Sequence, residues 1–117
     1  MDKSCVARID NEPAPTIFLE GEITTFSDEE INTAFQSLQS KPAPRIIIDF
    51  AAVKYINSAG VAILVNLVTE TEKNGGKLLF SGLVAHYRRV MEIVGITEYV
   101  KLFETVEGAK AEIGESE

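Results

Sequence analysis

The segment from Arg45 to Val68 most strongly constrains how this chain folds. Its first part, Arg45-Ile46-Ile47-Ile48-Asp49-Phe50, is apolar through its middle and rich in β-branched residues. Such a run is typical of a strand that is covered on both faces of a sheet. After a linker over residues 51–56, Asn57-Ser58-Ala59-Gly60 opens a segment with apolar residues at helical spacing, namely Val61, Ile63, Leu64, Val65, Leu67 and Val68. A buried strand followed by an apolar helix predicts an α/β fold, in which helices pack on the sheet.

The residues before this unit predict a hairpin and a helix. Residues 4–10 and 16–23 place apolar side chains at alternate positions, and only five residues separate the two segments. This pattern predicts two antiparallel strands. Ser27 and Glu30 have the spacing of a capping box, which predicts a helix start. The apolar stripe of this helix comprises Ile31, Ala34, Phe35 and Leu38 and ends before residues 41–44, which contain two prolines.

The residues after the unit predict two more strands and two more helices. The helix that begins near Ser58 ends near Asn74, before the pair Gly75-Gly76. Next come a strand over 77–83 and a helix over 86–94 that Gly95 closes. The side chains of this helix expected to point inward are Tyr87, Val90, Met91 and Val94. A strand over 99–103 follows, and then a helix with Val106, Ala109 and Ile113 on one side. The whole pattern predicts an α/β domain over residues 1–117, with a mixed sheet of four to five strands and about four α-helices.

Composition narrows the classes of function. A chain of 117 residues has the size of one domain. Its 11 Lys and Arg against 18 Asp and Glu give a net charge of −7, which opposes binding to a phosphate backbone, so we expect no direct nucleic-acid partner. The apolar runs are far shorter than the roughly 20 residues of a membrane span, so we expect no membrane insertion. Residues 1–4, Met-Asp-Lys-Ser, lack the pattern of a secretion signal, which favours a cytoplasmic location.

Metal and thiol chemistry have few candidate residues. Cys5 is the single cysteine and His86 the single histidine, so the chain cannot form an internal disulfide or a zinc site of several cysteines. We therefore expect no metal site and no cofactor. Cys5 lies in a strand pattern, which favours a small core residue over a redox centre.

The start of the predicted second helix is the candidate site for chemistry. Ser58 lies where a helix presents unpaired N–H groups and the positive end of its dipole, which favours an anion. Gly60 leaves room for a close approach to the backbone. The simpler interpretation is that Asn57 or Ser58 is only an N-cap, a role worth about 0.5–2 kcal/mol.

Five segments carry a resemblance to a known family. They are Gly21-Glu22-Ile23, Ile46 to Asp49, Tyr55 to Gly60, Gly75-Gly76 and Val94-Gly95-Ile96. With these segments the chain resembles, over nearly its whole length, an STAS domain of the anti-sigma factor antagonist family. In that family an Asp-Ser-Ser/Thr-Gly run opens the second helix, and its first serine accepts phosphate from an ATP-dependent serine kinase that is also the anti-sigma factor.

By position, that phosphoacceptor corresponds to Ser58. Asn57 stands where the family usually has Asp, Thr24 stands where the run Gly21-Glu22-Ile23 usually closes with Asp, and Ala59 replaces a second hydroxyl residue. Ser58 is therefore the only acceptor in the motif.

The resemblance implies a non-enzymatic binding protein that phosphorylation controls. The unmodified form would bind the serine kinase and anti-sigma factor, phosphorylation of Ser58 would release it, and a PP2C-like phosphatase would reverse the change. No residue of the chain is placed as a base beside Ser58, so we expect no catalytic residue. The expected partner-binding residues, besides Ser58 itself, are Thr24, Thr25, Phe26, Tyr55, Ile56, Asn57, Ala59 and Gly60.

Two alternatives stay open at this point. One is a structural STAS subunit that is never phosphorylated and docks on a partner such as the ATPase of a lipid transporter. The other is a sensor module that binds a small anion or a nucleotide at the helix start, although the chain lacks a GxxxxGK[ST] loop. A receiver domain with Asp49 as phosphoacceptor is disfavoured, because Asp10 and Glu12 lead into another strand and not into a helix.

Overall fold

The computed structural model describes residues 5–10, 14–38 and 44–116, with side chains as far as Ile113. The elements are β1 (Cys5–Asp10), β2 (Thr16–Ile23), the 3₁₀ turn η1 (Thr25–Ser27), α1 (Asp28–Ser37), β3 (Arg45–Ile56), α2 (Ser58–Lys73), β4 (Lys77–Ser81), α3 (Ala85–Val94), the 3₁₀ turn η2 (Ile96–Glu98), β5 (Val100–Phe103) and α4 (Val106–Ser116). This order confirms the predicted α/β class with a mixed sheet and four helices. Among the described residues, no helix combines the length and the apolar character that a membrane span requires.

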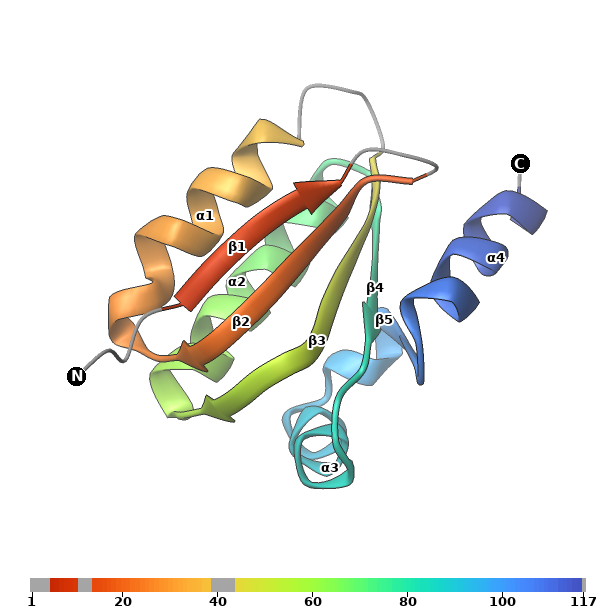
Figure 1. Ribbon diagram of the computed structural model, residues 1–117. Helices are drawn as coiled ribbons and strands as arrows, with labels where there is room; N and C mark the ends of the chain where they lie inside the picture. The colour runs from red at the N-terminus through yellow and green to blue at the C-terminus, as the bar shows by residue number, and fades with distance from the viewer. Residues whose placement is uncertain (1–4, 11–13, 39–43, 117) are drawn as a thin grey trace.

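The five strands form one sheet in the order β1-β2-β3-β4-β5. β1 and β2 pair antiparallel, which confirms the predicted hairpin, and every other neighbouring pair is parallel. Figure 1 shows α1 and α2 on one face of this sheet and α4 on the other. The helices thus form layers on both faces, which a buried parallel strand requires.

β3 contributes to both hydrophobic cores, as its apolar run predicts. Ile46, Ile48 and Phe50 belong to the larger core with residues of α1, α2 and α3. Ile47 points to the other face, where it packs in a smaller core with Ala14, Leu79, Ala109 and Ile113. Successive side chains of a strand point to opposite faces, so one short run of residues fills both layers.

The predicted linker over residues 51–56 is wrong, because β3 continues to Ile56. Its second half pairs with β2 and not with β4, since the pairing with β4 ends at Asp49 and Ser81 whereas the pairing with β2 runs on to Ile23 and Ile56. Much of this second half is exposed, and the apolar pattern of a buried strand therefore stops at Phe50 although the strand does not.

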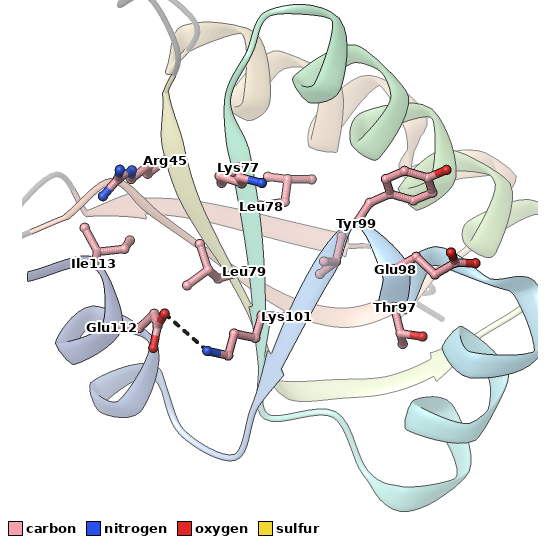
Figure 2. A pocket seen from close by; sticks show the side chains of 11 residues that line it. Arg45, Lys77, Leu78, Leu79, Thr97, Glu98, Tyr99, Lys101, Glu112 and Ile113 are labelled. Atoms are coloured by element: carbon pink, nitrogen blue, oxygen red, sulfur yellow. Dashed lines mark ion pairs between the residues drawn. The ribbon is translucent and has the colours of Figure 1, made fainter. Parts of the chain in front are cut away.

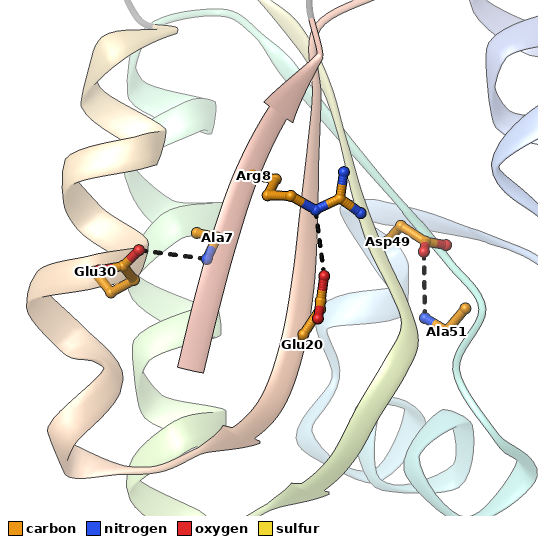
Figure 3. Close-up of polar contacts among 6 residues, drawn as sticks. All are labelled: Ala7, Arg8, Glu20, Glu30, Asp49 and Ala51. Carbon is orange, nitrogen blue, oxygen red and sulfur yellow. Dashed lines mark hydrogen bonds and ion pairs between the residues drawn. The ribbon is translucent and has the colours of Figure 1, made fainter. Parts of the chain in front are cut away.

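The predicted capping box is shifted by one turn. Ser27 precedes α1 but makes no side-chain cap, and the box is formed instead by Thr24 and Ser27 around η1. The Ser27 Oγ accepts a hydrogen bond from Thr24 N at 2.9 Å, and the Thr24 Oγ1 accepts one from Phe26 N at 3.2 Å. Glu30 has a different partner: its carboxylate accepts a hydrogen bond from the N–H of Ala7 on the edge strand β1 (Figure 3).

Three smaller points concern β4 and α3. β4 ends at Ser81 and not at Leu83, because Gly82 takes a positive φ of 77°. Gly95 adopts the left-handed conformation that closes α3, as predicted. Met91 is fully buried, but Val94 is 45% exposed and does not point inward as predicted.

A buried polar pair ties β3 to β4. Ser81 is fully buried, and its Oγ donates to Asp49 Oδ1 at 2.7 Å. The second oxygen of Asp49 accepts a hydrogen bond from Ala51 N at 3.3 Å (Figure 3). This contact lies beside a shift in the β2–β3 register between Phe18 and Glu20. The carboxylate thus supports the backbone where the regular ladder is interrupted.

We predict that Ser81→Ala destabilises the fold by about 1–3 kcal/mol, because it removes a buried donor to Asp49. Urea denaturation measures the change. Thr69→Ala is the control, since this exposed residue makes only a local hydrogen bond within α2, and it should stay within about 0.5 kcal/mol of the wild type. Equal stabilities of the two variants would contradict a structural role for the pair.

Candidate functional site

The candidate site lies where β2 and β3 end side by side (Figure 1). Glu22 pairs with Tyr55 and Ile23 with Ile56, so the residues that follow both strands emerge at one edge of the sheet. The N–H of Asn57 donates to the carbonyl oxygen of Ile23 at 3.1 Å. The structure therefore brings together the two segments of the predicted partner-binding surface, which are about 30 residues apart in the sequence.

Asn57 caps α2, and Ser58 does not. The backbone of Asn57 is extended, and its Oδ1 accepts a hydrogen bond from Gly60 N at 2.8 Å. Ser58 is the first residue of the helix and is exposed. Within the described part of the chain, no hydrogen bond is recorded for its hydroxyl. Because Asn57 satisfies the cap, the Ser58 hydroxyl is left at the surface.

Gly60 sets how closely α2 packs against β2. A Cβ at this position would lie 2.2 Å from the carbonyl oxygen of Ile23 and 2.9 Å from its carbonyl carbon. No side chain fits in that space, so the close approach that the sequence suggested is one between protein backbones.

The turn η1 presents an aromatic side chain beside the start of α2. Phe26 is 87% exposed, whereas Thr24 is buried at the base of the turn. Ser27 fixes this turn, since its Oγ accepts from Thr24 N and donates to the carbonyl of Glu22 at 3.0 Å. The sequence pattern at Ser27 indicated only a helix cap and gave no sign of this bridge between β2 and η1.

The predicted partner-binding residues divide by exposure. Those at the surface are Thr25, Phe26, Tyr55 and Ser58, and those that are half-buried are Asn57 and Ala59. Thr24, Ile56 and Gly60 are buried and support the surface from below. The exposed members of the predicted set are therefore two aromatic side chains and the hydroxyl groups of Thr25 and Ser58.

Tyr87 belongs to the site and was not predicted there. Its Oη accepts a hydrogen bond from Ile56 N at 3.1 Å, beyond the point where the pairing of β3 with β4 has ended. The sequence indicated only that Tyr87 points inward from α3. No signal in the local pattern identifies its partner, because 31 residues separate the two.

The electrostatics of the site favour an added negative charge. The first turn of α2 contains no acidic residue, so the positive end of the helix dipole is not compensated there. Cys5 lies near the other side of η1, and the pKa of its thiol is raised above the usual value. Burial is the main cause, and the charge of Glu30 adds to it, while a hydrogen bond with Ser27 opposes the shift in part. Among the described residues, no three His, Cys, Asp or Glu side chains are grouped so as to hold a metal ion.

Comparison with known proteins assigns the family. The family model described as STAS domain matches residues 7–109. The chain belongs to the STAS domain family. The anti-sigma-B factor antagonist of Listeria monocytogenes is 27% identical over 92 residues, which cover 79% of this chain and 80% of that protein.

Solved structures with the same fold include the following two. An anti-sigma factor antagonist from Mycobacterium paratuberculosis has a TM-score of 0.78 at 20% identity and 95% coverage of both chains. The Bacillus cell fate determinant SpoIIAA in its phosphorylated form has a TM-score of 0.71 at 19% identity, with 92% of this chain and 99% of that chain covered. At these identities the likeness establishes the STAS fold of the chain.

We predict that Gly60→Ala destabilises the protein by about 1–3 kcal/mol or more, because its Cβ overlaps the Ile23 carbonyl. Gly108→Ala is the matched control within α4, where the nearest atom to a new Cβ is Thr105 Oγ1 at 3.4 Å. The control should be neutral or gain up to about 1 kcal/mol from helix propensity. Urea denaturation of both variants tests this, and a Gly60→Ala variant as stable as Gly108→Ala would contradict the packing.

Proposed function

We propose that this STAS protein is an anti-sigma factor antagonist controlled by phosphorylation of Ser58. In its unphosphorylated form it binds a serine kinase that is also an anti-sigma factor, and phosphorylation releases that partner. A PP2C-like phosphatase restores the unmodified form. The observation that carries the proposal is the exposed Ser58 hydroxyl at the start of α2, where Asn57 already caps the helix.

Several further assignments belong to the same proposal. The chain acts as one STAS domain over residues 1–117 in the cytoplasm, without enzymatic activity of its own and without direct contact to nucleic acid or insertion into a membrane. The kinase contributes ATP, Mg²⁺ and the base that takes the hydroxyl proton. The bond from Ser58 Oγ to the γ-phosphorus forms as the bond to ADP breaks.

Phosphorylation acts by changing the charge of a binding surface. A phosphoserine adds about −1.5 to −2 charge at neutral pH. Within this chain the start of α2 stabilises that charge by about 0.3–1 kcal/mol, so the fold persists. At an interface the same group must lose its water, which costs several kcal/mol for each uncompensated ion. Since each 1.4 kcal/mol is about a tenfold change in affinity, the partner dissociates.

The exposed aromatic side chains provide the attraction that this charge opposes. Phe26 is 87% exposed and lies in η1, directly after β2. Tyr55 is 47% exposed and lies at the end of β3, which pairs with β2 at the site. Large aromatic side chains often contribute most of the binding energy of an interface. The partner is therefore expected to cover Phe26, Tyr55 and Ser58 together.

We expect Ser58→Asp to bind the cognate kinase at least about tenfold more weakly than Ser58→Ala, because a carboxylate mimics part of the added charge. A pull-down with both baits identifies the kinase, and calorimetry with the purified kinase measures the affinities. Thr69→Asp, on an exposed position three turns further along α2, is the charge control and should bind like the wild type. Equal affinities of Ser58→Asp and Ser58→Ala would refute the switch.

Intact mass after incubation with the kinase and ATP should also rise by one phosphate.

We expect Phe26→Ala to lower kinase affinity by at least about tenfold while leaving stability nearly unchanged, as for a central aromatic contact. The exposure of the ring is the reason for the unchanged stability. Val6→Ala, on the edge strand β1, removes another exposed apolar side chain and should leave the affinity unchanged. The same calorimetric assay compares the two. Wild-type affinity of Phe26→Ala would place the docking surface elsewhere.

A further inference from the structure

A second candidate site lies at the end of the sheet opposite to Ser58. A cavity of about 390 Å³ opens there beside the first residues of β3, β4 and β5, and α4 and η2 form its other walls. Figure 2 shows the side chains around it, with Arg45, Lys77 and Lys101 on three neighbouring strands. The volume lies within the range of about 300–1,000 Å³ that is usual for small-molecule sites.

The three cations project from the same face of the sheet. Arg45 and Lys77 are register partners on β3 and β4, and Lys101 is the register partner of Leu79 on β5. Alternation along β4 places Lys77 and Leu79 on one face, which is the face that α4 covers. Like charges directly opposite each other destabilise a sheet. In a chain with a net charge of −7, this grouping of positive charge requires an explanation.

Within the cavity, the compensation of these charges is incomplete. Lys101 forms an ion pair with Glu112 at 3.2 Å. The Nη1 atom of Arg45 is shielded from solvent and has no hydrogen-bond partner within the described residues. No ion pair of Lys77 is recorded among the described residues. A buried guanidinium N–H without an acceptor is unfavourable, so the site is one acceptor short.

The remaining lining is suited to an apolar group. Leu79 and Ile113 are nearly fully buried in the smaller core and also line the cavity. Tyr99, which is 55% exposed, lies at its edge. An occupant can therefore place an apolar body on these side chains while an anionic group reaches Arg45.

We propose that this cavity binds a small monocarboxylate with an apolar body. Its carboxylate accepts hydrogen bonds from Arg45 and balances Lys77, and its body rests on Leu79 and Ile113. A polyphosphate is disfavoured, because the carboxylates of Glu98 and Glu112 also line the cavity and repel a second or third negative charge. Arg45 begins β3 and Ser58 follows its end, and the strand of 12 residues spans roughly 40 Å at 3.3 Å per residue, so this site is independent of the proposed phosphorylation.

The test uses benzoate as the probe, benzamide as its neutral analogue and inorganic phosphate as an anion without an apolar body. Each is titrated into ¹⁵N-labelled protein while amide resonances are followed. We expect benzoate to shift the resonances of Leu79, Val100 and Lys101 in a saturable manner, whereas benzamide and phosphate leave them unchanged. Absence of benzoate binding, or equal binding of benzamide or phosphate, overturns the proposal.

Two variants and a control locate the binding. Arg45→Met should weaken benzoate binding by about tenfold or more, as loss of a charge-assisted hydrogen bond predicts. It should also leave the melting temperature of the free protein unchanged or raised, since it removes an unpartnered buried donor. Lys77→Met should weaken binding less, and Lys73→Met, an exposed lysine at the end of α2, should not weaken it. Unchanged binding by folded Arg45→Met and Lys77→Met would overturn the assignment.

Kinase binding should be the same in all of these variants. Failure of the benzoate test and failure of the Ser58 test can therefore be distinguished.

Discussion

The carbonyl oxygen of Ile23 is the atom on which the candidate functional site depends. It accepts the hydrogen bond of Asn57 N at 3.1 Å, and it lies 2.2 Å from the position that a Cβ of Gly60 would take. One backbone atom at the end of β2 thus determines both where α2 begins and how closely it packs. Ser58 lies between these two contacts, so its place at the surface follows from the backbone and does not require any bond of its own side chain.

The parts of the fold that could be predicted depend on short-range patterns. The run Ile46–Ile48 indicated a strand buried on both faces, and the two cores on either side of β3 confirm it. Gly95 predicted the left-handed end of α3, since few other residues adopt a φ of 94° without strain. At the candidate site, the pattern Asn57 to Gly60 predicted a helix start with an accessible anion-favouring end, and in the structure Asn57 takes the cap.

The parts that could not be predicted depend on partners that are distant in the sequence. β3 continues beyond Phe50 because β2 pairs with it, and its exposed residues carry no apolar pattern that would reveal this. The spacing of Ser27 and Glu30 fits the capping-box pattern, whereas a box that begins at Thr24 ends at Ser27 and not at the usual Glu or Gln. In the structure Thr24 and Ser27 form the box, and Glu30 bonds instead to the N–H of Ala7 on β1. Tyr87 completes the site across 31 residues, which no local window includes.

Asn57 gives the proposed switch a neutral starting point. The Asp usual in the family carries a negative charge beside the phosphoacceptor, whereas an amide retains the cap to Gly60 N without that charge. With no acidic residue in the first turn of α2, the change on phosphorylation is from no charge to about −1.5 to −2, all of it new to the surface. A partner that covers Phe26 and Tyr55 therefore meets an uncharged helix start before phosphorylation and a fully charged one after it, and this contrast does not require any movement of the backbone.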